Sequence, residues 1–181
     1  MSVEHRGQEL GPSAYNPGIN LLYLPTTEGC NSIATAEQKD FVDQAGDVRP
    51  RDRFAGGGTS PLRNEKRYGA IKAIDPVTGE TKANLKLPYP NGGNGLLATG
   101  GNLVFNGQRD GNFAAYDGRT LQELWSFNAG TAFKAPPITF AIAGKQYIAI
   151  LAGARQNPAD AAEYPELKNN SPASMLYVFA L

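Results

Sequence analysis

The chain has 181 residues, of which 41% are hydrophobic, and its 17 Lys+Arg balance its 17 Asp+Glu. This length and composition suit one folded domain or a large part of a bigger one, and they argue against wholesale disorder. A formal charge of zero provides no long-range field that would attract nucleic acid or an anionic membrane. The single cysteine, Cys30, and the single histidine, His5, exclude an intrachain disulfide framework and any metal site built on several Cys or His side chains.

The sequence shows neither of the two common membrane or export signals. No apolar run approaches the about 20 residues that a membrane-spanning helix needs, and the first six residues lack the basic-then-apolar pattern of an export signal. We therefore expect no membrane span and no export signal in this chain.

Turn-forming and aromatic residues dominate the pattern along the chain. The 21 Gly and 13 Pro, together with 8 Tyr and 8 Phe, are typical of many short strands joined by turns. The first expected strand covers residues 19–24, and Pro25 should end it. Further strands are expected at residues 69–75, 80–87, 95–99, 102–106, 112–116, 122–127, 137–142, 146–151 and 175–181. Only residues 159–166 favour a helical turn, so the sequence predicts an all-β fold.

Residues 26–68 differ from the rest of the chain. They combine turn formers, charge clusters at residues 49–53 and 63–67, and a glycine run. A stretch this long without regular structure is unusual inside a compact domain. We expect a long surface excursion or a segment that packs on something else, and we divide the chain into residues 1–68 and 69–181.

A short internal repeat indicates the architecture. Residues 73–83 match residues 115–125, an offset of 42 residues from Ala73 to Ala115, which is close to the about 40–45 residues of a four-stranded propeller blade. In each copy a small Ala packs closely and an Asp caps a turn through the backbone near Thr; in the pattern the next strand then carries a large aromatic residue, Trp125 in the second copy. The repeat predicts a complete blade over residues 95–127, with Trp125 buried against the sheet before it. It also favours turn capping by Asp75 and Asp117 over a pair of acid/base carboxylates.

The repeat and its surroundings resemble a known family. The pattern Ala-x-Asp-x-x-Thr-Gly-x-x-x-Trp resembles the tryptophan-docking motif of the eight-bladed quinoprotein alcohol dehydrogenases, which use pyrroloquinoline quinone (PQQ). Residues 12–25 are similar to the family's "SYNP…GLVYIP" segment, residues 97–107 to "TAGNLVFQG" and residues 135–151 to "PPITY…GKQYVAVL". The two copies are imperfect, because Ala83 replaces the docking Trp in one and Leu121 replaces the turn Gly in the other. The resemblance covers nearly the whole chain and implies the C-terminal third of the family: a partial β-propeller of about two and a half blades of four-stranded antiparallel sheet.

The resemblance also implies a function. It implies the C-terminal portion of an oxidoreductase that oxidises alcohols with PQQ, beside a Ca²⁺ or lanthanide ion held by other parts of the propeller. The family's catalytic base and metal ligands arise from blades N-terminal to anything that matches here, so no catalytic or metal-binding residue is carried over, and we expect the isolated chain to be inactive. The candidate cofactor contacts are Asn94, Gly95 and Asn157. At three positions where the family has its usual pocket residues, this chain has Glu9, Gly93 and again Asn157.

The expected partners follow from the same resemblance. In the family the last strand joins a sheet formed with the N-terminal end, and residues 146–151 and 175–181 are apolar at consecutive positions, so they need cover on both faces. We expect the remaining propeller blades, in a longer parent chain or a complementary chain, or else self-association. The resemblance implies the periplasm. The alternative hypothesis is a cofactor-free propeller remnant that acts as a binding or structural module; a truncated reading frame with no independent role is a third.

Overall fold

The computed structural model describes residues 3–5, 11–35, 57–61, 66–91, 94–153 and 162–181. These residues form almost only strands and turns. They include three antiparallel sheets that follow one another along the chain, here named the first, second and third sheets. None of the helical segments in the described part is long and apolar enough to span a bilayer. The all-β prediction is confirmed.

The first and second sheets each have four strands and the third has three. The first sheet has the order β2 (Ala14–Asn16), β3 (Leu21–Glu28), β6 (Tyr68–Ile74) and β7 (Thr81–Leu87). The second has the order β8 (Leu96–Ala98), β9 (Leu103–Gly107), β10 (Asn112–Asp117) and β11 (Glu123–Asn128). The third has the order β12 (Ile138–Ile142), β13 (Lys145–Ala152) and β14 (Met175–Ala180). The predicted strands and the predicted blade over residues 95–127 are present, with ends that differ by a few residues.

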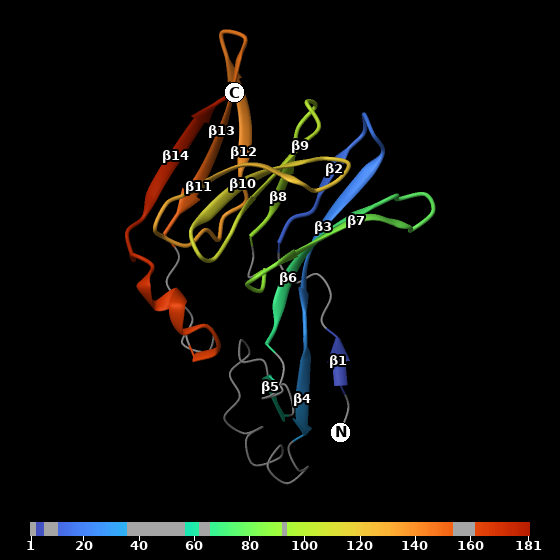
Figure 1. The fold of residues 1–181 in the computed structure, drawn as a ribbon, viewed down its shortest axis with the longest axis vertical. Helices are drawn as coiled ribbons and strands as arrows, with labels where there is room; N and C mark the ends of the chain where they lie inside the picture. Colours follow the sequence, from blue (N-terminus) through green and yellow to red (C-terminus); the bar gives the residue numbers. More distant parts are fainter. Residues whose placement is uncertain (1–2, 6–10, 36–56, 62–65, 92–93, 154–161) are drawn as a thin grey trace, which may run out of the picture.

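Two clusters of buried side chains hold the sheets together. One joins the first sheet to the second and includes Tyr23 and Ile71 on one side and Tyr116 on the other. The second joins the second sheet to the third and includes Phe113 and Ile148. Because successive residues of a strand point to opposite faces, β9 and β10 contribute to both clusters, and the second sheet lies between its neighbours (Figure 1). Sheets stacked in chain order are the arrangement of a partial propeller.

The first strands of the three sheets begin close to one another. The backbone N–H of Leu96 donates to the carbonyl of Pro12 at 3.0 Å, just before β2. A Cβ added to Gly95 would collide with both Pro12 and Pro136, which precede β2 and β12. Close approach of three chain segments therefore requires glycine at this position. This meeting point is named the inner end.

Two predictions about the N-terminal part need correction. The strand β3 does not end at Pro25 but continues through it to Glu28, and Pro25 lies opposite Ile71 of β6. The neighbouring strand β2 pairs only with residues 21–23 of β3, so Pro25 lies where β3 is an edge strand, and its missing N–H costs no hydrogen bond there.

The excursion over residues 26–68 contains regular structure. Within it, β4 (Cys30–Thr35) pairs with β5 (Gly57–Pro61) and with β1 (Val3–His5) in a small antiparallel sheet, which lies below the first sheet in Figure 1. Residues 36–56 and 62–65 of the excursion lie outside the described residues. The first sheet itself takes β2 and β3 from one side of residue 68 and β7 from the other.

The predicted position of Trp125 is wrong. Its side chain is 42% exposed, and its ring meets Phe113 edge-on at 6.1 Å and Phe179 of the third sheet at 5.2 Å. Trp125 is paired with Ala115, which belongs to the cluster between the second and third sheets. The indole therefore faces the following sheet rather than the preceding one, and that sheet leaves it partly uncovered.

The predicted helical turn over residues 159–166 is confirmed in its described part, where Ala162 and Glu163 are helical. The structure has a 3₁₀ helix, η1, over Pro165–Asn169 in the connection between β13 and β14, whereas residues 159–161 lie outside the described residues. Pro165 can begin such a turn because its fixed φ suits the first helical position.

Candidate functional site

Two of the three predicted cofactor contacts lie at the inner end. Asn94 is 1% exposed, and its Nδ2 donates to the carbonyl of Gly107 at 2.6 Å. The carbonyl of Gly95 accepts a hydrogen bond from Nδ2 of Asn106 at 3.2 Å. Both residues thus tie the start of β8 to β9. The third predicted contact, Asn157, lies outside the described residues, as do Glu9 and Gly93.

Buried polar side chains continue from the inner end between the first and second sheets. The Nδ2 of Asn91 donates to the carbonyls of Thr26 and Ala70 at 2.9 and 3.0 Å, which fixes the connection from β7 to β8. Nε2 of Gln108 donates to the hydroxyl of Tyr116 at 2.9 Å. Burial, the largest cause, raises the pKa of Tyr116, so its hydroxyl keeps its proton. These contacts satisfy backbone and side-chain groups that would otherwise be costly to bury.

Asn106 is an exception among these buried amides. Its side chain is fully buried, and its Oδ1 has no hydrogen-bond partner among the described residues. An unsatisfied buried amide oxygen costs free energy, so this atom is a candidate contact for a donor. It is an acceptor, however, and an anionic ligand would need donors at this place.

The connection between β13 and β14 reaches across to the first sheet through an ion pair. The carboxylate of Glu163 accepts hydrogen bonds from Nε and Nη2 of Arg67 at 2.9 and 2.5 Å and from its backbone N–H at 2.8 Å. Burial alone would raise the pKa of Glu163, but the hydrogen bonds from Arg67 outweigh it and hold this pKa below its usual range. The hydroxyl of Tyr164 donates to the carbonyl of Arg67, and its ring meets Tyr89 edge-on at 5.3 Å.

The same connection also contacts the second sheet. Nδ2 of Asn170 donates to the carbonyl of Arg109 at 2.6 Å, and the N–H of Ser171 donates to the carbonyl of Gly130 at 2.8 Å. Leu167 of η1 is 1% exposed. We name residues 162–171 the strap, because they bind all three sheets together at the end opposite the β12–β13 hairpin (Figure 1).

No motif in the sequence indicated the contacts of the strap. Arg67 and Glu163 are 96 residues apart and belong to segments with no shared pattern. The contact between them could therefore not be inferred from the pattern of either segment.

Asp75 and Asp117, the two aspartates of the repeat, lie in turns at the end of their sheets opposite the inner end. Oδ1 of Asp75 accepts the N–H of Val77 at 2.9 Å, and Oδ1 of Asp117 accepts those of Arg119 and Thr120 at 2.9 and 2.8 Å. Backbone hydrogen bonds lower the pKa of both carboxyls, so they stay ionised as turn caps. Turn capping is confirmed, and their bonds leave no reason to assign them acid/base roles.

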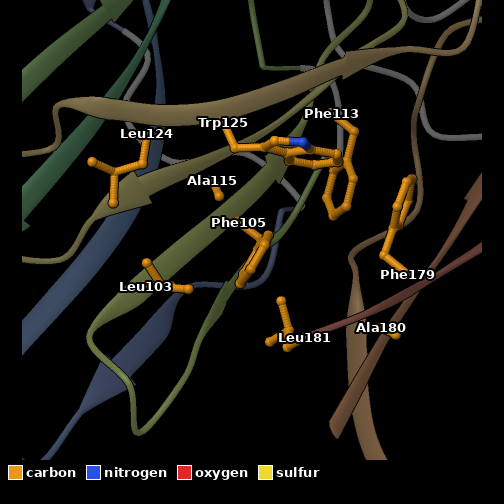
Figure 2. Close-up of a pocket in the computed structure, with 9 residues that line it drawn as sticks. All are labelled: Leu103, Phe105, Phe113, Ala115, Leu124, Trp125, Phe179, Ala180 and Leu181. Atoms are coloured by element: carbon orange, nitrogen blue, oxygen red, sulfur yellow. The ribbon is translucent and has the colours of Figure 1, made fainter.

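A groove opens between the second and third sheets. It has a volume of about 320 Å³, and Figure 2 shows Trp125 and Phe113 on one side and Phe179 and Leu181 on the other. Its lining consists of apolar side chains: Leu103, Phe105, Phe113, Ala115, Leu124, Trp125, Phe179, Ala180 and Leu181. Leu124 and Leu181 are 57% and 51% exposed. The groove offers apolar contact but few polar groups to orient a small ligand.

Comparisons with known proteins relate the chain to one group of enzymes. Residues 59–148 match the family model described as "PQQ: Glucose/ethanol/alcohol dehydrogenase, beta-propeller domain". A curated relative, the quinohemoprotein alcohol dehydrogenase ADH IIB of Pseudomonas putida, is 38% identical over 173 residues, which is 93% of this chain and 24% of the relative.

Solved structures agree with this match. The quinohemoprotein alcohol dehydrogenase from Comamonas testosteroni superposes with a TM-score of 0.74 at 25% identity, over 96% of this chain and 26% of that one. A structure titled europium-containing methanol dehydrogenase superposes with a TM-score of 0.76 at 25% identity, over 97% of this chain and 33% of that one. The chain therefore spans about a quarter to a third of the length of these three proteins.

The described residues can be tested against the cofactor that this family uses. PQQ carries several carboxylates and needs hydrogen-bond donors or cations around it. Asn94 already donates to Gly107, and the space in front of Gly95 is filled by Pro12 and Pro136. In the described part of the chain no group of three or more His, Cys, Asp or Glu side chains could hold a metal ion. Asn94 and Gly95 thus make contacts within this chain, and we assign no catalytic step to them.

Proposed function

Since this chain belongs to the β-propeller family of PQQ-dependent quinoprotein alcohol dehydrogenases, we propose that it forms part of the propeller of an oxidoreductase that oxidises alcohols. The observation that carries the proposal is the repeat from Ala73 to Ala115. Its two copies lie in equivalent strands of two successive four-stranded sheets, and 93% of the chain aligns with ADH IIB of Pseudomonas putida.

In this proposal the chain supplies structure rather than chemistry. PQQ, when bound, would be the oxidant that accepts the two electrons from the alcohol, and a Ca²⁺ or lanthanide ion beside it would be held by other parts of the propeller. The residues of the inner end hold β8 against β9, and the strap fixes the three sheets relative to one another. Direct contact of Asn94, Gly95 and Asn157 with the cofactor stays a prediction. The enclosed positions of Asn94 and Gly95 favour support of a site through β8 over contact with it.

The proposed partners are further propeller blades, either from a longer parent chain or from a complementary chain. Support comes from the third sheet, which has three strands among the described residues where the first and second sheets have four, and from the exposed apolar side chains Ile138, Ile142, Leu176 and Val178. The relatives are bacterial enzymes, and the proposed location is the periplasm.

A second candidate function is a cofactor-free propeller remnant that binds another protein. Two observations favour it. Asn94 and Gly95, the predicted cofactor contacts at the inner end, make contacts within this chain, and an open apolar groove borders Trp125.

A chimaera separates the two candidates. The segment of ADH IIB that aligns with this chain is replaced by residues 1–181, and the purified chimaera is loaded with PQQ and Ca²⁺. The enzyme proposal expects a folded chimaera that oxidises a primary alcohol. A chimaera that melts cooperatively but neither binds PQQ nor oxidises alcohol would instead support the remnant.

A further inference from the structure

The side chain of Asn106 lies among apolar residues in the space between the first and second sheets. Asn106 of β9 pairs with Leu96 of β8 and with Ala114 of β10, and both of these residues belong to the buried cluster between the two sheets. Residues directly opposite one another in a sheet project from the same face. The amide of Asn106 therefore projects into that cluster, where its side chain is fully buried.

The orientation of this amide is set by a hydrogen bond. Its Nδ2 donates to the carbonyl oxygen of Gly95 at 3.2 Å. A rotation that exchanged Nδ2 and Oδ1 would place two acceptors against each other, because a carbonyl oxygen cannot donate. Oδ1 therefore points away from Gly95, and it has no hydrogen-bond partner in the described part of the chain. An amide oxygen buried in this way needs a donor.

The hydroxyl of Tyr116 lies on the same face of the second sheet and has a proton to donate. Tyr116 pairs with Val104, two residues before Asn106, and belongs to the same buried cluster. Its hydroxyl accepts a hydrogen bond from Nε2 of Gln108, two residues after Asn106, at 2.9 Å. The ring therefore runs along β9 on the face from which Asn106 projects. Burial raises the pKa of Tyr116, so the hydroxyl stays protonated, and no residue of the described structure accepts that proton.

We propose that one buried water molecule joins these two side chains. It accepts the proton of the Tyr116 hydroxyl and donates one of its own protons to Oδ1 of Asn106, so that one molecule supplies both the acceptor and the donor that these groups need. Buried waters in proteins are typically held by two to four hydrogen bonds to polar groups that have no other partner. The inference depends on the contacts between the first and second sheets and not on the proposed oxidation chemistry.

Water fits this place better than an ion does. An anion would face the lone pairs of Oδ1 of Asn106, and a cation would face the proton of the Tyr116 hydroxyl. Either ion would also bury a charge in the cluster that contains Leu96 and Val104, which is costly without a partner of opposite charge. Water is neutral and is a donor and an acceptor at once.

Relaxation dispersion of the oxygen-17 signal of water tests the site, because it counts the waters that a protein holds for longer than its own rotation time. The Asn106→Leu chain, whose new side chain has a similar shape but no acceptor, should hold one long-lived water fewer than the original chain. Asn106→Met is a second variant in case the branched side chain prevents folding, and it should show the same loss.

Asn16→Leu is the matched control. Asn16 is also buried, but its Nδ2 donates to Thr99 and Asn102 and its Oδ1 accepts the N–H of Gly18. Its amide is thus satisfied within the chain, and the count of long-lived waters should not change. Circular dichroism melts and sedimentation verify that the compared chains are folded and in the same state of association.

A double-mutant cycle in urea unfolding tests the link between the two side chains. Removing either partner deprives the shared water of a bond, so the second removal should cost less than the first. The combined effect of Asn106→Leu and Tyr116→Phe on the unfolding equilibrium constant should be at least about threefold smaller than the product of the single effects. Tyr23→Phe is the control partner, because the hydroxyl of Tyr23 donates directly to Gly118; its effect should multiply with that of Asn106→Leu to within about twofold.

Three results would overturn the proposal. The first is an equal number of long-lived waters in the original chain and in a folded Asn106→Leu or Asn106→Met chain. The second is an equal loss in the Asn16→Leu chain, which would show that the lost water does not belong to Asn106. The third is a cycle in which Asn106→Leu and Tyr116→Phe act independently.

Discussion

Leu121 provides a test in which two opposing effects can be separated. Its backbone has φ of 57°, a left-handed conformation that costs a residue other than glycine about 1–2 kcal/mol. Its side chain is 2% exposed in the cluster between the first and second sheets, and truncating a leucine so placed costs about 2–5 kcal/mol. Burial is the larger effect, so both Leu121→Ala and Leu121→Gly should destabilise the chain, by about 2–4 kcal/mol.

The order of the two variants is the more specific expectation. In an ordinary strand position, glycine is less stable than alanine by about 0.5–1 kcal/mol. At position 121 the glycine variant relieves the left-handed strain, so it should be no less stable than the alanine variant. Gly79 is the reciprocal control: it has φ of 74° and no atom within 4 Å of an added Cβ, so Gly79→Leu should gain strain without burial and cost about 1 kcal/mol.

Urea unfolding followed by circular dichroism measures these differences, and an unchanged m-value would show that the unfolded states are comparable. A Leu121→Gly chain that is more stable than the original would refute the reasoning. It would mean that strain, and not the buried contact between the first two sheets, dominates at this turn.

Three further outcomes are expected. Phe113→Ala should destabilise the chain by about 3–5 kcal/mol in urea unfolding, because Phe113 is fully buried between the second and third sheets; a loss below about 1 kcal/mol would contradict the packing described. Tyr23→Phe should cost about 1 kcal/mol by the same assay, since it removes the hydrogen bond to Gly118, whereas no change would mean that this bond adds nothing. The contact of Glu163 with Arg67 should stabilise the strap at neutral pH and be lost as the pH falls through the lowered pKa of Glu163. The protection factors of the strap amides (the intrinsic exchange rate divided by the observed rate at the same pH) should therefore fall in acid in the original chain. In Glu163→Gln they should be low and nearly independent of pH, and equal profiles in the two chains would show that the carboxylate does not have this role.

Local chemistry made the repeat turns predictable from the sequence. Asp75 and Asp117 bond to backbone N–H groups two and three residues ahead, and an aspartate followed by threonine encodes such a turn without help from the rest of the fold. The turn-forming and aromatic residues predicted the strands for a similar reason, since pairing partners lie close along the chain.

Features that depend on distant segments were not predictable. The face to which Trp125 points depends on its pairing with Ala115, next to an irregularity in register between β10 and β11. Pro25 continues a strand only because β2 stops short of it. The contact between Arg67 and Glu163 joins segments that meet only after all three sheets have stacked. At the inner end, the sequence indicated the position of Asn94 but not its bond to Gly107.

The most direct test of the account is alcohol oxidation, measured with added PQQ and Ca²⁺ on the 181-residue chain alone and on the ADH IIB chimaera that contains it. The account predicts no turnover of a primary alcohol by the chain alone, because no catalytic residue is assigned to it, and turnover by the chimaera, because the chain supplies the matching sheets of the propeller. Turnover by the chain alone, or a folded chimaera without turnover, would contradict the claim that this chain is a structural part of a quinoprotein alcohol dehydrogenase.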